Sequence, residues 1–239
     1  MTVAAAAPAI PRSALERELK FTLPASRAPF AARMLAALCR PDPRFARAVV
    51  STVYYDSPDL CLMAQKLNSD FLKTKVRLRW YSALSGEAGS ASAFVEVKSR
   101  VGCLRRKARA ETALPGALLA AAPLTDPVFA RALDVARTLE GDLPAWLLPV
   151  MMVRYERHRF VEPVSGARVS LDFRIEAPRA NRVLLGQGGP VRLGVAVVEV
   201  KGAGEELPRA LRPLAHLGAR RASFSKYGEL GLALLRFRP

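Results

Sequence analysis

Polar and apolar residues alternate along several short segments of the chain, a pattern that predicts strands with one polar and one apolar face. In residues 15–23, Glu16, Glu18 and Lys20 fall on one face, whereas leucine and phenylalanine dominate the other. The same alternation, or a run of β-branched and aromatic residues, predicts further strands over 49–55, 71–82, 93–100, 107–112, 151–161, 167–175 and 194–201. We therefore expect roughly eight strands.

Amphipathic segments predict the helices, which cover residues 26–39, 127–139, 207–217 and 227–237. Asp126 and Pro127 are typical of a helix start. Pro213 is expected to kink or divide its helix, because proline has no N–H to donate. Together these elements predict an α+β fold with a mainly antiparallel sheet. We expect a disordered lead over residues 1–12 and a single domain over residues 13–239.

Five of the predicted strands carry a row of ionic residues opposite a row of apolar residues. An ordinary sheet with one face in water gives the same alternation. However, like charges on one open face repel each other unless a polyanion neutralises them. We therefore expect the sheet to curl into a barrel with the ionic rows inside and the helices outside. The rows are Glu16/Glu18/Lys20, Lys75/Arg77/Arg79, Glu96/Lys98/Arg100, Arg168/Ser170/Asp172/Arg174 and Glu199/Lys201. In residues 153–159 the alternation is mixed, which leaves the facing of Arg154 and Arg157 open.

The charge of the chain narrows the classes of partner. Lysine and arginine total 37 against 21 aspartates and glutamates, a net charge of +16. Such a surplus predicts an anionic partner, either nucleic acid, an anionic membrane or phosphorylated small molecules. Six of the eight lysines fall in strand-like or motif-like segments, although arginine supplies the other 29 cations. This placement favours a specific role for the compact ammonium group.

Composition excludes several other classes. With 239 residues, of which 51% are hydrophobic, the chain is not an intrinsically disordered protein. No apolar run approaches the ~18 residues that a membrane-spanning helix needs. The three cysteines form no C-x-x-C pair and there are only two histidines, so a zinc site is not expected. Widely spaced cysteines suit a reduced, cytoplasmic chain.

An ordered series of motifs resembles one group of proteins. The segments are ERELKF at 16–21, YYDSPDL at 54–60, KVRLRWY at 75–81, FVEVKSR at 94–100, KAR at 107–109, RYER at 154–157, RVSLD at 168–172, VVEVKG at 197–202 and FSKYGEL at 224–230. Together they resemble the triphosphate tunnel metalloenzymes, or CYTH-like proteins, and within them the VTC domain, the catalytic domain of polyphosphate polymerases. The Ser-Lys-Tyr sequence at 225–227 favours the VTC branch over the adenylate-cyclase and thiamine-triphosphatase branch.

The resemblance implies an antiparallel eight-stranded β-barrel around a basic tunnel, with helices packed outside. It implies binding of ATP and of a triphosphate or polyphosphate chain, and transfer of the γ-phosphate of ATP to that chain with a divalent metal, Mn or Mg. Lys98, Arg79 and Lys226 would then be catalytic, and Glu199 and Glu18 would hold the metal. The implied phosphate-binding residues are Lys20, Lys75, Arg77, Arg79, Lys98, Lys107, Arg109, Arg157, Arg168, Lys226 and Tyr227.

Other functions stay open beside this polymerase activity. The first motif carries both Glu16 and Glu18, closer to a hydrolase, so a metal-dependent triphosphatase or polyphosphatase is the main alternative. A non-catalytic polyphosphate-binding module is the next. Specific nucleic-acid binding is not expected, because there is no basic reading helix, no aromatic RNA-binding pattern and no basic tail. The chain is expected to be cytoplasmic, or held at the inner face of a membrane by a separate membrane protein.

Overall fold

The computed structural model describes residues 18–68, 70–84, 92–102, 104–186, 189–202, 204 and 206–236. The predicted disordered lead at 1–12 and the predicted strand residue Glu16 lie outside these residues. Within the described ranges, no helix is both long enough and apolar enough to cross a bilayer.

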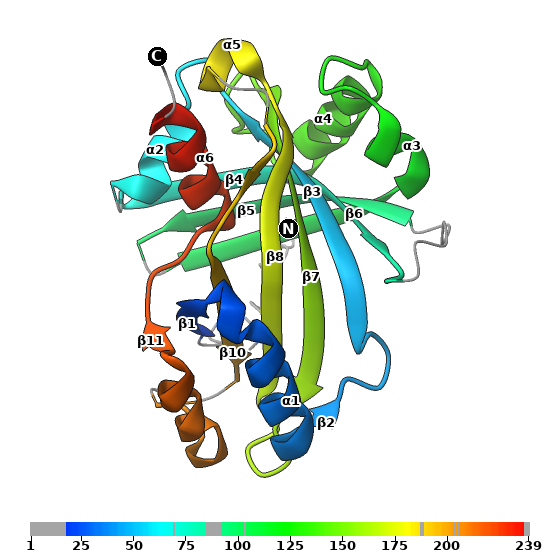
Figure 1. Cartoon of the computed structure of the whole chain (residues 1–239). Coiled ribbons are helices and arrows are strands. Elements are labelled where there is room, and N and C mark those ends of the chain that lie inside the picture. Colours follow the sequence, from blue (N-terminus) through cyan, green and yellow to red (C-terminus); the bar gives the residue numbers. More distant parts are fainter. Residues whose placement is uncertain are drawn as a thin grey trace, which may run out of the picture.

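The fold is built on one antiparallel sheet with short helices packed around it (Figure 1). The long strands are β1 (Glu18–Pro24), β3 (Arg47–Asp56), β4 (Leu72–Ser82), β5 (Ser92–Val101), β6 (Leu104–Pro115), β7 (Leu148–Val161), β8 (Arg168–Ala180) and β10 (Val195–Lys201). Three further strands of two residues each extend the sheet: β2 (Arg40–Pro41), β9 (Val191–Arg192) and β11 (Arg220–Arg221). The α+β class, the antiparallel pairing and the eight long strands therefore follow the prediction.

The predicted closure into an eight-stranded barrel is wrong. The sheet contains 11 strands and is open, with the order β11-β1-β10-β8-β7-β3-β4-β5-β6 and with β2 on β7 and β9 on β8. Its two ends, β11 and β6, do not pair within the described residues. Both ends are cationic, since β11 is Arg220–Arg221 and β6 carries Lys107 and Arg109. Closing the sheet would place these like charges on adjacent strands, which is unfavourable.

Strong twist nevertheless gives the sheet a concave face. In Figure 1, β7 and β8 run along the length of the molecule, whereas β4, β5 and β6 cross them. Strand twist of a fixed hand accumulates over successive strands and produces this shape. Ionic rows that are distant in sequence therefore lie on the same side of the curved sheet rather than along a flat surface.

The predicted placement of the helices on the apolar side of the sheet is correct for most of the fold but wrong for the last helix. The structure contains α1 (Ala28–Leu38), α2 (Cys61–Leu67), α3 (Gly116–Ala121), α4 (Val128–Leu139), α5 (Arg182–Leu185) and α6 (Lys226–Arg236), with 3₁₀ segments η2 (Ala25–Arg27) and η3 (Arg209–Leu217). On the apolar side, Trp80 of β4 belongs to the same cluster as Phe129 of α4, and Leu171 of β8 clusters with α1. On the ionic side, Leu230 of α6 clusters with Tyr54, which lies opposite Arg77, so α6 packs against that face. Each such side chain stabilises the fold by about 1.5–3 kcal/mol.

Two predictions for the helices need correction. Residues 209–217 form a continuous 3₁₀ segment rather than a kinked or divided α-helix. The tighter i to i+3 pattern accommodates Pro213, which cannot donate a backbone hydrogen bond. The pattern also missed α2 and α3, which are only seven and six residues long. Helices this short carry too few turns for a clear amphipathic period.

The mixed alternation of β7 comes from an inner face that is mostly apolar. The register of β7 against β3 is regular over residues 151–158, so Tyr155 and Arg157 share one face with the apolar residues before them. That face is apolar because α6 packs against it. The two register shifts against β8 come from extra residues in β8. Arg154 lies on the other face of β7, with its side chain 51% exposed beside Glu176. Arg157 is buried against Asp172.

Asp56 joins the end of β3 to two helices. Its buried carboxylate accepts hydrogen bonds from the backbone N–H groups of Leu62 and Met63 at 2.8 Å each. It also accepts one from the hydroxyl of Tyr227 in α6 at 2.7 Å. The Asp56 side chain thus supplies acceptors for backbone N–H groups in the first turn of α2, which have no partner within the helix. Its bond to Tyr227 also holds α6 against the sheet.

Asp56→Ala is expected to lower the free energy of unfolding by about 3 kcal/mol, because several buried donors lose their acceptor. Urea denaturation of the purified chain measures this loss. Asp134→Ala on α4, where the carboxylate is 74% exposed, is the matched control and should stay within about 0.5 kcal/mol of the wild type. Equal stability of the two variants would show that Asp56 is not a structural hub.

Candidate functional site

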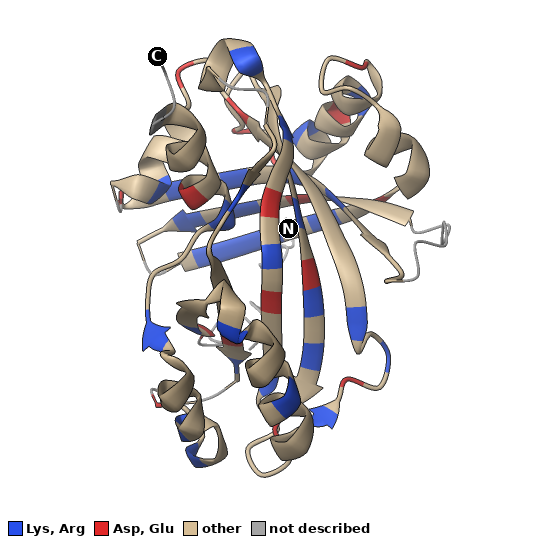
Figure 2. Cartoon of the chain, viewed as in Figure 1, with Lys and Arg blue, Asp and Glu red and all other residues tan. Residues whose placement is uncertain are grey.

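The concave face of β4, β5 and β6 carries two adjacent rungs of ionic residues. In the first rung, Lys75 lies opposite Lys98, which in turn lies opposite Lys107. In the second rung, Arg77 lies opposite Glu96, which lies opposite Arg109. Bands of basic residues cross these three strands in Figure 2. Directly opposed residues on neighbouring strands are close enough to interact, so the lysine rung places like charges side by side.

Glu96 is the counterion of the second rung. Its carboxylate is almost fully buried and accepts from Arg77 Nε at 2.7 Å, with Arg77 Nη2 at 2.6 Å. Lys107 Nζ lies at 3.5 Å and Arg79 Nη1 at 3.9 Å from the same group. Burial raises the pKa of Glu96, but the charges of Arg77 and Arg79 outweigh it and hold the pKa well below its usual range. The carboxylate is therefore ionised and allows the arginines to be buried.

Two members of the lysine rung, Lys75 and Lys98, lack such a counterion. Among the described residues, no carboxylate lies within ion-pairing distance of Lys75 or Lys98. The charge of Arg77 and then burial lower the pKa of Lys98 to about 6. Burial and then the charge of Lys20 lower the pKa of Lys75 to about 8, although Tyr54 opposes the shift. Both shifts show that an additional negative charge at this rung would be favourable.

A second ionic cluster lies where β7, β8 and β10 meet the start of α6. Asp172 is fully buried between Arg157, with Nε–Oδ1 and Nη2–Oδ2 distances of 2.6 Å, and Lys226, with Nζ–Oδ2 at 2.6 Å. Glu199 lies beside the same cations, at 3.3 Å from Arg157 Nη2 and 3.5 Å from Lys226 Nζ. Burial raises the pKa values of both carboxyls, but Arg157 and Lys226 outweigh it and hold them low.

Lys20 and Lys75 connect the two clusters. Lys20 Nζ lies 3.8 Å from Glu199 Oε1 and donates a 3.4 Å hydrogen bond to the carbonyl of Phe224. Lys75 Nζ donates to Ser225 Oγ at 3.4 Å. The segment just before α6 therefore contacts lysines from β1 and from β4. The sheet is open at its edges, yet this segment brings its two halves together.

The predicted phosphate-binding residues occupy different parts of this surface. Most of them lie in the two clusters: Lys20, Lys75, Arg77, Arg79, Lys98, Lys107, Arg109, Arg157 and Lys226. Arg168 is exposed at the first residue of β8, opposite Lys201, and so lies at the margin. Tyr227 does not direct its hydroxyl at these cations, because the hydroxyl donates to buried Asp56.

Two further residues on β3 belong to the site and were not predicted. Thr52 Oγ1 accepts a 3.0 Å hydrogen bond from Arg79 Nε and orients that side chain. Burial raises the pKa of Tyr54, but the charges of Arg77 and Arg79 outweigh it and lower the pKa to about 8. Tyr54 also stacks on Tyr227, with ring centroids 4.7 Å apart. Nearly all of β3 is buried, so no exposed alternation marks its inner face.

The carboxylates match a hard divalent metal in chemistry but do not form a site by themselves. The described residues contain no group of three or more His, Cys, Asp or Glu side chains placed to hold a metal. The predicted ligand Glu199 is paired with cations, and the predicted ligand Glu18 has Lys20 at 3.6 Å and Lys201 at 3.9 Å. Magnesium sites often combine one or two carboxylates with substrate phosphates. A metal here would need such a phosphate for the remaining ligands.

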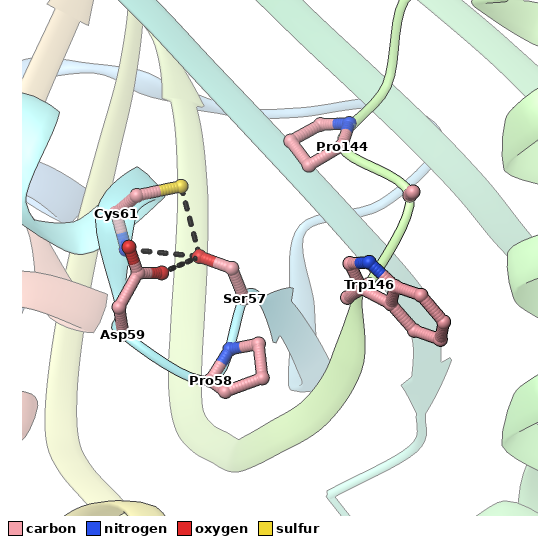
Figure 3. Close-up of a pocket in the computed structure, with 7 residues that line it drawn as sticks. Ser57, Pro58, Asp59, Cys61, Pro144 and Trp146 are labelled. Carbon is pink, nitrogen blue, oxygen red and sulfur yellow. Dashed lines mark hydrogen bonds between the residues drawn. The ribbon is translucent and has the colours of Figure 1, made fainter.

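A separate hollow of about 380 Å³ lies near the start of α2 (Figure 3). Ser57 Oγ lies within hydrogen-bonding distance of Asp59 and Cys61 on one side, and Trp146 lies on the other. The lining residues are Ser57, Pro58, Asp59, Cys61, Pro144, Ala145 and Trp146. None of them is basic, so this hollow does not share the chemistry of the concave face.

The lysine rung makes anion binding dependent on pH. A bound polyanion stabilises the ammonium of Lys98 and raises its pKa above the value of about 6. Binding then takes up a proton, and the affinity falls as the pH rises above 6. Titration calorimetry with tripolyphosphate in buffers of different protonation enthalpy counts this proton. Lys98→Arg, which stays charged, should take up about one proton fewer than the wild type at pH 7 to 8.

Proton uptake by tripolyphosphate itself is common to both proteins and cancels in the comparison. If Lys98→Arg takes up as many protons as the wild type, Lys98 is not the group that titrates.

Comparisons with known proteins agree with the ordered motifs. A family model described as the VTC domain matches residues 15–235. No curated protein sequence matches the chain. Solved structures with some similarity include proteins provisionally described as adenylate cyclases from Vibrio parahaemolyticus (16% identity, 90% of this chain and 96% of that chain covered, TM-score 0.47) and Bacillus halodurans (14%, 88%, 92% and 0.47).

A chain of the Schizosaccharomyces pombe Mediator head module is also similar (10% identity, 94% of this chain and 96% of that chain covered, TM-score 0.44). These three similarities are too weak to carry a functional argument. The family match, in contrast, spans nearly the whole chain. The chain therefore belongs to the VTC domain family.

Proposed function

We propose that the concave face binds a polyphosphate chain and that the domain transfers the γ-phosphate of ATP to this chain. Membership of the VTC family supports a role with triphosphate or polyphosphate. The observation that carries the proposal is the rung Lys75, Lys98 and Lys107, because its first two members are partly buried cations that form no ion pair with a carboxylate among the described residues. A run of phosphates supplies closely spaced negative charges of the kind that this rung lacks.

The arrangement suits phosphoryl transfer, in which positioning and charge neutralisation provide most of the catalysis. An oxygen of the terminal phosphate of the polyphosphate chain forms a bond to the γ-phosphorus of ATP. The bond between this phosphorus and the oxygen that bridges the β- and γ-phosphates breaks. ADP leaves with the electron pair of the broken bond. The nucleophile is already an ionised phosphate, so no general base is required.

Particular residues have particular parts in this reaction. Arg79 is held on the concave face by its contacts with Thr52 and Glu96. Lys98 and Lys226 reach the bound phosphates from opposite clusters. A divalent metal, when bound, would neutralise phosphate oxygens, and Glu199 with Glu18 are the candidate protein ligands.

Hydrolysis of triphosphate or polyphosphate is the second candidate function. It is favoured by the first motif, in which Glu16 precedes Glu18 as in the hydrolase pattern. The same cationic face would bind the substrate, and water would replace the terminal phosphate as the nucleophile. The two functions therefore differ in their products rather than in their binding residues.

Incubation of the purified chain with γ-labelled ATP and Mn, followed by a gel that resolves phosphate chains, distinguishes these functions. We expect a ladder of labelled chains. Arg79→Ala and Lys98→Ala should each lower the rate about 100-fold or more, because each removes a fixed cation from the transferring phosphate. Arg182→Ala on α5, at an exposed position, is the matched control and should keep the rate of the wild type.

Labelled free phosphate without a ladder would replace the polymerase proposal by the hydrolase. Binding of added polyphosphate without either product would leave a binding module. A ladder of equal intensity from the Arg79→Ala and Lys98→Ala variants would contradict the placement of the reaction on the concave face.

A further inference from the structure

One end of β4, β5 and β6 exposes several large apolar side chains. Phe71 is 72% exposed and Leu104 is 71% exposed, while Leu72 and Val101 are nearly half exposed. They adjoin one another, because Leu72 pairs with Val101 and Val101 pairs with Leu104 across the strands. We call these four residues the apolar tip. Single exposed apolar residues are common, but a group at one place marks an interaction surface.

The turn of the tip is held to Phe71. The N–H of Gly102 donates to the carbonyl of Phe71 at 3.0 Å. The backbone of Gly102 is left-handed, with φ +57°, and a Cβ there would lie 2.7 Å from the Phe71 ring. The Phe71 ring therefore packs directly against the backbone at position 102, where only glycine fits well. This contact holds the ring at the end of the sheet.

The tip continues the apolar side of the sheet beyond its helices. Further along the same strands, Val76 and Val97 are covered and cluster with Phe129 of α4. The apolar tip lies past this cover. In Figure 1 it corresponds to the left ends of β4, β5 and β6, away from α3 and α4.

The opposite side of the same strand ends is cationic. Lys73 pairs with Arg100 and Arg100 pairs with Arg105, each one residue from a member of the apolar row. Successive residues of a strand face opposite sides, so the cations lie behind the tip. Among the described residues no carboxylate pairs with these three cations. Lys66 of α2 lies nearby, since burial and then the charge of Lys73 lower its pKa.

We propose that this end of the sheet docks on the surface of an anionic lipid bilayer. The apolar tip would enter the boundary between headgroups and acyl chains, and the cations behind it would contact anionic headgroups. Exposed aromatic and aliphatic side chains next to unpaired cations match that surface in both hydrophobicity and charge. The inference does not depend on the reaction proposed above.

Flotation of the full chain with vesicles tests the docking. Vesicles of phosphatidylcholine alone are compared with vesicles that also contain phosphatidylserine. We expect the wild type to bind only the vesicles that contain phosphatidylserine. The double variant Phe71→Ser/Leu104→Ser should bind these vesicles at least about tenfold more weakly, because two apolar side chains no longer insert. Val164→Ser, at a turn position that is 91% exposed, is the matched control and should bind as the wild type does.

The concave face is itself cationic and can attract anionic vesicles. The double variant keeps those cations, so a loss of binding in this variant is due to the apolar tip. Equal binding by the wild type and the double variant would overturn the proposal, as would the absence of binding by the wild type. A dimer in sedimentation analysis that the double variant loses would make a second copy the occupant and would also overturn it. Tripolyphosphate affinity, which the tip substitutions should not alter, verifies that the double variant is folded.

Discussion

A sheet can collect this many cations on one concave face only because a few buried carboxylates lie among them. Glu96 neutralises the arginines of β4, and Asp172 with Glu199 neutralises Arg157 and Lys226. Removal of one such carboxylate would leave a buried charge without a partner, at a cost of about 3–5 kcal/mol. The three carboxylates thus allow the cations of this face to lie close together.

The remaining cations are not neutralised by the protein, and this imbalance connects the fold to the proposed binding of a polyanion. Lys75 and Lys98 lie beside arginines and lysines rather than acids, and their pKa values fall to about 8 and about 6. An elongated polyanion relieves this repulsion along the whole face, whereas a single small anion relieves it at one rung.

Much of this arrangement follows from side-chain alternation, and the exceptions have physical causes. Alternation placed Arg77 and Glu96 on the ionic face correctly, since pleating imposes a period of two. It could not place Arg157, because the other residues on that face of β7 are apolar and pack against α6, so the face does not look ionic in the sequence. It could not reveal that the sheet stays open, since alternation defines faces and not the pairing of edges. The bond from Tyr227 to Asp56 joins residues 171 positions apart, and no local pattern contains it.

A comparison of two double variants with equal loss of charge tests most directly whether the concave face binds phosphate chains. Arg79→Gln/Lys107→Gln removes two cations from that face, and Arg182→Gln/Arg212→Gln removes two from exposed sites elsewhere. We expect the affinity for tripolyphosphate, measured by titration calorimetry, to fall about 100-fold or more in the first variant and by less than about threefold in the second. Equal losses in both variants would show that the overall charge, and not this site, attracts the anion.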